Sequence, residues 1–138
     1  MRNMRLLIDA NIILDVLQER QPHVADASVI WKLCETDQAE GVVSSLTVAD
    51  LIYVMRKELD EDQIADVIEK LRLIFVISDF TAADLFKAAE MKWADFEDAV
   101  QSAIAERVQA DYIITRNVRD FIKSKVMAFA PSEYIAWM

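Results

Sequence analysis

Short apolar runs alternate with helical patterns along the chain, and this alternation limits the fold more than any other sequence feature. The apolar runs at 5–8, 42–44, 73–77 and 112–115 predict buried strands, and 126–129 predicts an edge strand. Helices are predicted at 10–19, 61–71, 81–91, 95–109 and 118–124. Two further helices are predicted, one that begins at Pro22 and stops near Gly41 and one that begins at Thr47, and a turn is predicted after Pro131. We therefore expect an α/β fold, a three-layer α/β/α sandwich with a mostly parallel central sheet.

Glycine, cysteine and histidine each occur once, which excludes several kinds of site. The single glycine, Gly41, excludes dinucleotide-binding loops, Walker A loops and nucleophile elbows, because each of these needs several glycines. The single cysteine, Cys34, excludes an internal disulfide and a cysteine-based zinc cage. With 138 residues, 54% of them hydrophobic, and no repeat or linker, the chain is expected to form a single domain over residues 1–138.

The charge and hydropathy of the chain limit its partners. A formal net charge of −9 predicts that the protein repels nucleic acid on average, so binding would need a local basic patch or bound cations. The apolar run at 4–8 is interrupted by Asp9 too early for a signal peptide, and no run is long enough to cross a membrane. We therefore expect a cytoplasmic protein without a membrane partner.

Acidic and polar residues follow the predicted strands at their carboxyl ends, where ligands bind in parallel α/β folds. The helix predicted at 95–109 begins at the same edge, because it runs back to the start of the fourth strand. The residues brought to this edge are Asp9, Asn11, Ser44, Ser45, Thr47, Asp50, Asp95, Asp98, Thr115, Arg116, Asn117 and Asp120.

Two explanations are open for these acids. Asp9 suits a helix N-cap, and both Thr47-x-x-Asp50 and Asp95-x-x-Asp98 fit a capping box. Alternatively, the acids form a metal site, because like charges gathered at one edge destabilise a fold unless a cation or protons neutralise them. Oxygen ligands without histidine or cysteine favour Mg²⁺ or Mn²⁺. For the first turn of the helix at 95–109, we expect Asp95 to cap and Asp98 to bind the ion.

An acidic metal site of this kind suits hydrolysis of a phosphodiester, because a divalent ion polarises the phosphate and orients a water without a side-chain nucleophile. Basic residues stand together after the fourth predicted strand, at Arg116, Arg119, Lys123 and Lys125. They form either a solvated helix face or a surface that contacts a polyanion backbone.

Four motifs together resemble the PIN domain family. They are L-I-D-A-N-I-I-L-D, S-S-L-T-V-A-D-L-I-Y-V-M-R-K, D-F-E-D-A-V-Q and I-I-T-R-N-V-R-D-F, and they span nearly the whole chain in the family's order. The sequence is most similar to the bacterial VapC-type toxins. The resemblance implies a Rossmann-like sheet and an Mg²⁺- or Mn²⁺-dependent ribonuclease that acts on RNA. It also implies the toxin of a type II toxin–antitoxin pair, with a cognate antitoxin and a homodimer as partners.

The resemblance also implies roles for individual residues. Asp9 matches the first metal carboxylate and Asp98 the third, while Thr115 matches a hydroxyl that supports the ligands. Two positions depart from the family pattern. Asp50 stands where relatives usually have glutamate, and its shorter side chain favours contact with the metal ion through a water. Asn117 stands where some relatives have aspartate, so Asp120 is the other candidate for the last carboxylate.

The predicted site is assigned as follows: catalytic Asp9, Asp50, Asp98 and Asp120; metal-binding Asp9 and Asp98; supporting Asn11, Thr47, Asp95, Thr115 and Asn117; RNA-binding Arg116, Arg119 and Lys123. A PIN-like protein-interaction module with weakened or lost nuclease activity is the alternative, suggested by Asp50. A receiver-type signalling domain is disfavoured, because the chain lacks a convincing set of paired acids, phosphoacceptor aspartate and lysine at the strand ends.

Overall fold

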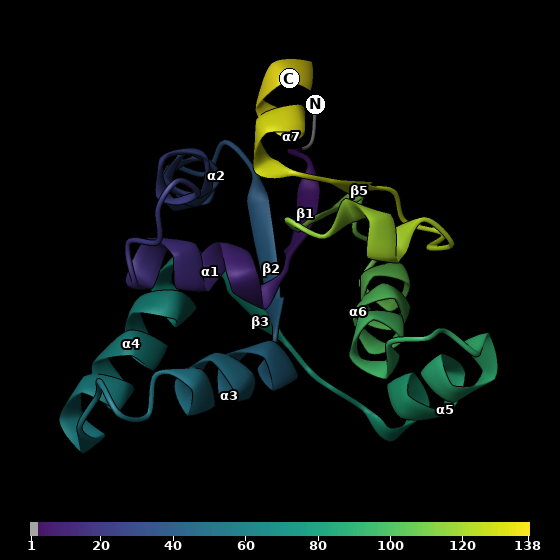
Figure 1. Ribbon diagram of the computed structural model, residues 1–138, viewed down its shortest axis with the longest axis horizontal. Helices are drawn as coiled ribbons and strands as arrows, with labels where there is room; N and C mark the ends of the chain where they lie inside the picture. Colours follow the sequence, from purple (N-terminus) through teal and green to yellow (C-terminus); the bar gives the residue numbers. More distant parts are fainter. Residues whose placement is uncertain (1–2) are drawn as a thin grey trace.

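The computed structural model describes residues 3–138, which contain a five-stranded sheet in the order β3-β2-β1-β4-β5 (Figure 1). Every neighbouring pair of strands is parallel, so the expected parallel α/β sheet is confirmed. The strands are β1 Arg5–Ile8, β2 Glu40–Ser44, β3 Val76–Ser78, β4 Tyr112–Ile114 and β5 Ala128–Phe129.

Helices cover both faces of the sheet, and the face that each covers follows from the side-chain alternation along the strands. In β1, Leu6 and Ile8 pack against α1, α2, α3, α4 and α7, whereas Leu7 points to the opposite face and packs against α5, α6 and η1. The helices are α1 Ala10–Leu17, α2 Val24–Glu35, α3 Ser45–Val54, α4 Glu61–Ile74, α5 Ala82–Met91, α6 Phe96–Arg107, the 3₁₀ helix η1 Val118–Phe121 and α7 Pro131–Trp137. Within residues 3–138, no helix is both long and apolar enough to cross a membrane.

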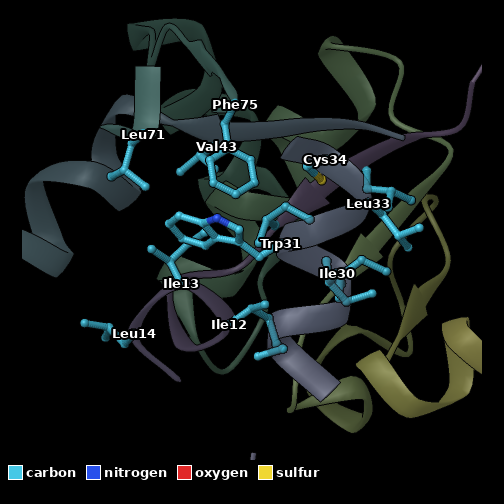
Figure 2. Packing of buried hydrophobic residues seen from close by; sticks show 14 of the residues in the cluster. Ile12, Ile13, Leu14, Ile30, Trp31, Leu33, Cys34, Val43, Leu71 and Phe75 are labelled. Atoms are coloured by element: carbon cyan, nitrogen blue, oxygen red, sulfur yellow. The ribbon is translucent and has the colours of Figure 1, made fainter. Parts of the chain in front are cut away.

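Gly41 lies inside β2 and does not end a helix, so the prediction of a helix stop at this residue is wrong. The preceding helix α2 already ends at Glu35, and Gly41 has no positive φ. Its missing side chain is required by packing, because a Cβ there would lie 2.6 Å from Cδ1 of Phe75 and 2.7 Å from Sγ of Cys34. Figure 2 shows Phe75 beside Trp31, with ring centroids 5.2 Å apart in an edge-to-face arrangement. The core therefore uses the space above Gly41 for an aromatic ring.

Several other element boundaries differ from the sequence expectation by a few residues, and three of the differences have a clear physical interpretation. Leu73 and Ile74 complete α4, so the third strand begins at Val76; a helix and a strand compete for such an apolar run, and periodicity alone does not separate them. The segment after Pro131 is a helix and not only a turn, with proline at its start, where the missing N–H costs nothing. The helix predicted at 118–124 is shorter, a 3₁₀ helix over Val118–Phe121.

The carboxyl ends of β1, β2 and β4 meet at one edge of the sheet, because Ile8 pairs in register with Ile114, and Leu7 with Val42. The chain leaves β1 toward β2 and β3 on one side, and later returns to place β4 on the other side of β1. Such a reversal of strand order opens a crevice beside the strand ends. The residues that follow β1 and β4 therefore lie next to each other at this edge, where the hydroxyl of Thr115 donates a hydrogen bond to Asp9.

Candidate active site

Asp9 directly follows β1 and caps α1, and four groups hold its carboxylate in place. One oxygen accepts a hydrogen bond from the backbone N–H of Ala10 at 2.8 Å and lies 3.4 Å from the amide nitrogen of Gln101. The other accepts from the hydroxyl of Thr115 at 2.7 Å and lies 3.4 Å from Nδ2 of Asn11. Thr115 and Asn11 therefore support Asp9 directly, and the half-buried carboxylate has a fixed orientation.

Asp95 and Asp98 have different positions in the first turn of α6. Asp95 is the N-cap, and its Oδ1 accepts a hydrogen bond from the backbone N–H of Asp98 at 3.0 Å. The carboxylate of Asp98 has no hydrogen-bond or ion-pair partner within residues 3–138, so the turn is not a reciprocal capping box. Burial raises the pKa of Asp98 to about 7, and the charges of Asp95, Asp9, Asp120 and Glu97 raise it further in that order. Asp98 is therefore the acid on which the repulsion of this cluster is concentrated.

Glu97 is a member of the cluster that the predicted site did not include. Burial raises its pKa first, followed by the charges of Asp50, Asp95 and Asp9, and a hydrogen bond with Asp50 raises it as well. Glu97 therefore brings a long carboxylate to the short side chain of Asp50. The sequence places Glu97 in the first turn of a helix, but the direction of its side chain depends on how α6 packs against the sheet. A small cavity of about 50 Å³ is lined by Asp9, Ala10, Leu46, Thr47, Asp50, Glu97, Asp98 and Gln101.

Ser44, and not Thr47, caps α3. Its Oγ accepts a hydrogen bond from the backbone N–H of Thr47 at 3.1 Å, so the capping box proposed for Thr47 and Asp50 is wrong. The buried Thr47 lies inside α3, with its hydroxyl 3.1 Å from Oγ of Ser44.

Ser44 Oγ also lies 3.4 Å from Oε1 of Gln101, whose amide nitrogen faces Asp9. Gln101 thus links the ends of β1 and β2; a glutamine in the middle of the apolar run of α6 is the sequence signal that could have revealed it.

The residues of this cluster fit a partly hydrated divalent ion. No three histidine, cysteine, aspartate or glutamate side chains among residues 3–138 are arranged to hold an ion together. Mg²⁺, however, retains several waters and often uses one or two carboxylates, and Asp9 and Asp98 are the candidates for this role. A cation between them would also relieve the repulsion that raises the pKa of Asp98.

Arg116 is bound to an acid that the sequence did not connect with it. Its Nε donates to Oδ2 of Asp15 at 2.8 Å and a second guanidinium nitrogen lies 3.3 Å from Oδ1, although the two residues are 101 positions apart. The Asp15 side chain is completely buried in α1, and that of Arg116 is 30% exposed. This pair ties the segment after β4 to α1, so the guanidinium is already occupied. The backbone N–H of Asn117, on the same segment, donates to the hydroxyl of Thr115 at 3.1 Å.

Arg119, Asp120 and Lys123 are exposed and border a second, larger cavity. It measures about 230 Å³ and is lined by Trp93, Ala94, Asp95, Asp98, Arg119, Asp120, Ile122 and Lys123. Asp98 lines both cavities, so the larger one lies next to the acidic cluster. The structure therefore brings together Asp9, Asp50, Asp98 and Asp120 near the strand ends, with Arg119 and Lys123 beside them.

Comparison with known proteins identifies the family and the fold. A family model of the PIN domain matches residues 5–119. A toxin–antitoxin complex from Klebsiella pneumoniae is 20% identical with a TM-score of 0.70, covering 91% of this chain and 97% of its own. VapBC2 from Rickettsia felis, solved with a DNA fragment from its promoter, is 18% identical with a TM-score of 0.70, covering 92% and 98%. VapC20 from Mycobacterium tuberculosis, described as a sarcin–ricin loop cleaving toxin, is 12% identical with a TM-score of 0.62, covering 78% and 86%.

No curated protein matches the chain. The family model, however, includes β1, α1, β2, α3, α6, β4 and the beginning of η1. These elements carry the first three motifs, the fourth motif as far as Arg119, and the acidic cluster except Asp120. The match covers far more than half of the 138 residues. The chain belongs to the PIN domain family.

Proposed function

We propose that the protein is a divalent-metal-dependent endoribonuclease that cleaves single-stranded RNA, with Mg²⁺ as its ion and Mn²⁺ as a substitute. The main support is the carboxylate of Asp98, which is free of the helix cap and has its pKa raised to about 7 beside Asp9 and Asp120. Such a site is costly for the fold without a cation, and its oxygen ligands suit a hard divalent ion. Membership in the PIN domain family agrees with this activity.

In this proposal, Asp9 and Asp98 hold the ion, which would polarise the scissile phosphate and lower the pKa of the attacking water. Thr115 and Gln101 fix the direction of the Asp9 carboxylate by their hydrogen bonds. Asp50 and Asp120 act through waters near the ion, because Asp50 is one methylene shorter than the glutamate of its relatives. The water oxygen bonds to phosphorus as the bond to the 3′ oxygen breaks, so the products carry a 5′-phosphate and a 3′-hydroxyl.

We further propose that the protein is the toxin of a type II toxin–antitoxin pair. The solved structures that it resembles include a toxin–antitoxin complex and VapBC2, and each is covered almost completely by this chain. An antitoxin would bind the nuclease and block it, and a homodimer is the expected assembly. If the gene lies beside a short reading frame for a DNA-binding protein, co-expression of the two should yield a complex without nuclease activity.

A protein-interaction module with weakened nuclease activity is the second candidate. Two observations favour it: Asp50 replaces the usual glutamate, and no three acids among residues 3–138 are preorganised around one ion. Metal titration separates the candidates. A nuclease should bind Mn²⁺ and cleave RNA, whereas an interaction module should do neither while still binding its partner protein.

The direct test is incubation of purified protein with mixed single-stranded RNAs in Mg²⁺, Mn²⁺ or EDTA, followed by analysis of the product ends. The Asp98→Asn variant should lose cleavage. Asp66→Asn is a matched control, since it makes the same chemical change at an exposed position of α4 away from the cluster. Undiminished cleavage in EDTA, or equal cleavage by the two variants, would contradict the proposed mechanism.

A further inference from the structure

The larger cavity beside the acidic cluster has two apolar walls. Trp93 is half-buried, and its ring meets the buried Phe121 edge-on with centroids 6.1 Å apart, which anchors the indole to the core. Ile122, which follows Phe121 in the sequence, is 83% exposed and also borders the cavity. An anchored indole that still lines a cavity loses little conformational entropy when it packs against a flat ligand.

The same cavity contains the cations of this region that have no acidic partner. Within residues 3–138, neither Arg119 nor Lys123 forms an ion pair, whereas the nearby Arg116 and Lys125 pair with Asp15 and Glu106. Both side chains without an ion pair are exposed and line the cavity. In a chain with a net charge of −9, these two cations are the positive groups that a phosphate could contact in a cavity whose wall also carries the carboxylates of Asp95, Asp98 and Asp120.

The cavity also lies next to the acidic cluster. Asp98 lines both it and the small cavity that contains Asp9 and Asp50, and the charge of Asp120 acts on Asp98. A ligand seated against Trp93 therefore lies directly beside the acids to which we assign catalysis. On the cavity wall, the carboxylate of Asp120 and the oxygen of Asp95 that does not cap α6 can accept hydrogen bonds from amino or hydroxyl groups of that ligand.

We propose that this cavity binds the nucleotide next to the cleaved phosphodiester, with its base stacked on Trp93 and its phosphates contacted by Arg119 and Lys123. Single-stranded nucleic acids are bound in this way, by aromatic side chains under the bases and by cations along the backbone. The volume of about 230 Å³ is below the roughly 300–1,000 Å³ that holds a drug-sized molecule, which suits a single base. The inference rests on the proposed ribonuclease activity and adds a substrate-binding site to it.

The test uses a set of RNAs that are identical except for one abasic nucleotide, placed at each position in turn. Cleavage by the wild type in Mg²⁺ gives kcat/KM for each RNA. Fluorescence anisotropy gives the RNA affinity and uses the Asp9→Asn variant, in which the RNA should stay uncleaved and the cavity should be unchanged because Asp9 does not line it. At the position bound by Trp93, loss of the base should weaken affinity about 5- to 150-fold, the usual range for one stacked base. In Trp93→Ala, intact RNA should bind more weakly by a similar factor, and the abasic nucleotide should have no further effect.

Three variants serve as controls. Trp93→Phe keeps an aromatic ring against Phe121 and should retain most of the base dependence. Trp137→Phe changes an exposed tryptophan of α7 and should bind all RNAs like the parent protein. Lys123→Ala should weaken intact and abasic RNAs equally and reduce the salt dependence by about one charge, because it removes a phosphate contact.

The outcomes separate this inference from the proposed function. If RNA is cleaved but the abasic penalty is the same in wild type and Trp93→Ala, or no position shows a penalty, the nucleotide site is refuted and the ribonuclease stands. If the wild type neither binds nor cleaves any RNA, both are refuted. If the penalty disappears in Trp93→Ala and persists in Trp137→Phe, the site is established.

Discussion

Replacement of Asp98 by asparagine should stabilise the metal-free protein at neutral and alkaline pH. Burial and the neighbouring acids raise the pKa of Asp98 from 3.8 to about 7, a difference that corresponds to roughly 4 kcal/mol at about 1.36 kcal/mol per pH unit. The side chain is only partly buried, so solvent screens much of this energy, and about 1–2 kcal/mol should remain. For a domain of this size, that corresponds to an increase in Tm of roughly 3–8 °C.

The sign follows from proton linkage. Because the folded protein binds this proton more tightly than the unfolded chain does, the contribution of Asp98 to stability is most favourable below about pH 4 and is lost as the pH rises from 3.8 toward 7. The wild type without metal should therefore lose stability across this range, and Asp98→Asn should lose less. Mg²⁺ should stabilise the wild type above pH 7 and have little effect on the variant.

Chemical denaturation in EDTA at several pH values measures this effect, with Asp66→Asn as the control for a change of one charge. A second series in Mg²⁺ measures the contribution of the ion. If Asp98→Asn is no more stable than the control above pH 7, or if its stability has the same pH dependence as that of the wild type, then Asp98 does not carry the repulsion of the cluster.

Three further predictions concern the residues around the site. Asp95→Ala should cost about 1 kcal/mol of stability, the usual loss of an N-cap, and should largely retain Mn²⁺ binding in calorimetry; loss of the metal here, with retention in Asp98→Asn, would mean that the two acids are assigned the wrong way round. Arg116→Ala should destabilise the fold by about 2–4 kcal/mol, and by more than Asp15→Asn does, because it leaves the buried carboxylate of Asp15 without its cation. If the folded Arg116→Ala and Asp15→Asn variants bind RNA with equal affinity, Arg116 does not contact RNA. Gly41→Ala should cost about 1–3 kcal/mol in urea denaturation through overpacking against Phe75, and an unchanged midpoint would show that the core yields easily.

Local sequence patterns were sufficient for the order of the secondary-structure elements and for much of the acidic edge. The strand 5–8 and the helix after Asp9 follow from apolar runs and periodicity, which depend only on neighbouring residues. The same holds for the assignment of Asp95 as the cap of α6, because a cap is made by a side chain and a backbone N–H three residues apart. The parallel sheet follows from the alternation of these elements, and it places the residues after β1 and β4 together.

The tertiary structure decided which side chains meet. The pairing of Arg116 with Asp15, the bridge from Gln101 to Asp9 and the contact of Glu97 with Asp50 join residues from different elements, so no local pattern contains them. Gly41 is explained only by the ring of Phe75 that packs above it. Burial raises the pKa of Asp98 first, followed by the neighbouring charge of Asp95 and then the charges of Asp9 and Asp120, which come from other parts of the chain. The burial and the effect of Asp9 and Asp120 depend on how closely α6 approaches the ends of β1 and β4. Local geometry could be read from the sequence because it is set within a few residues, whereas these contacts and charges exist only after the sheet has brought distant segments within a few ångströms of one another.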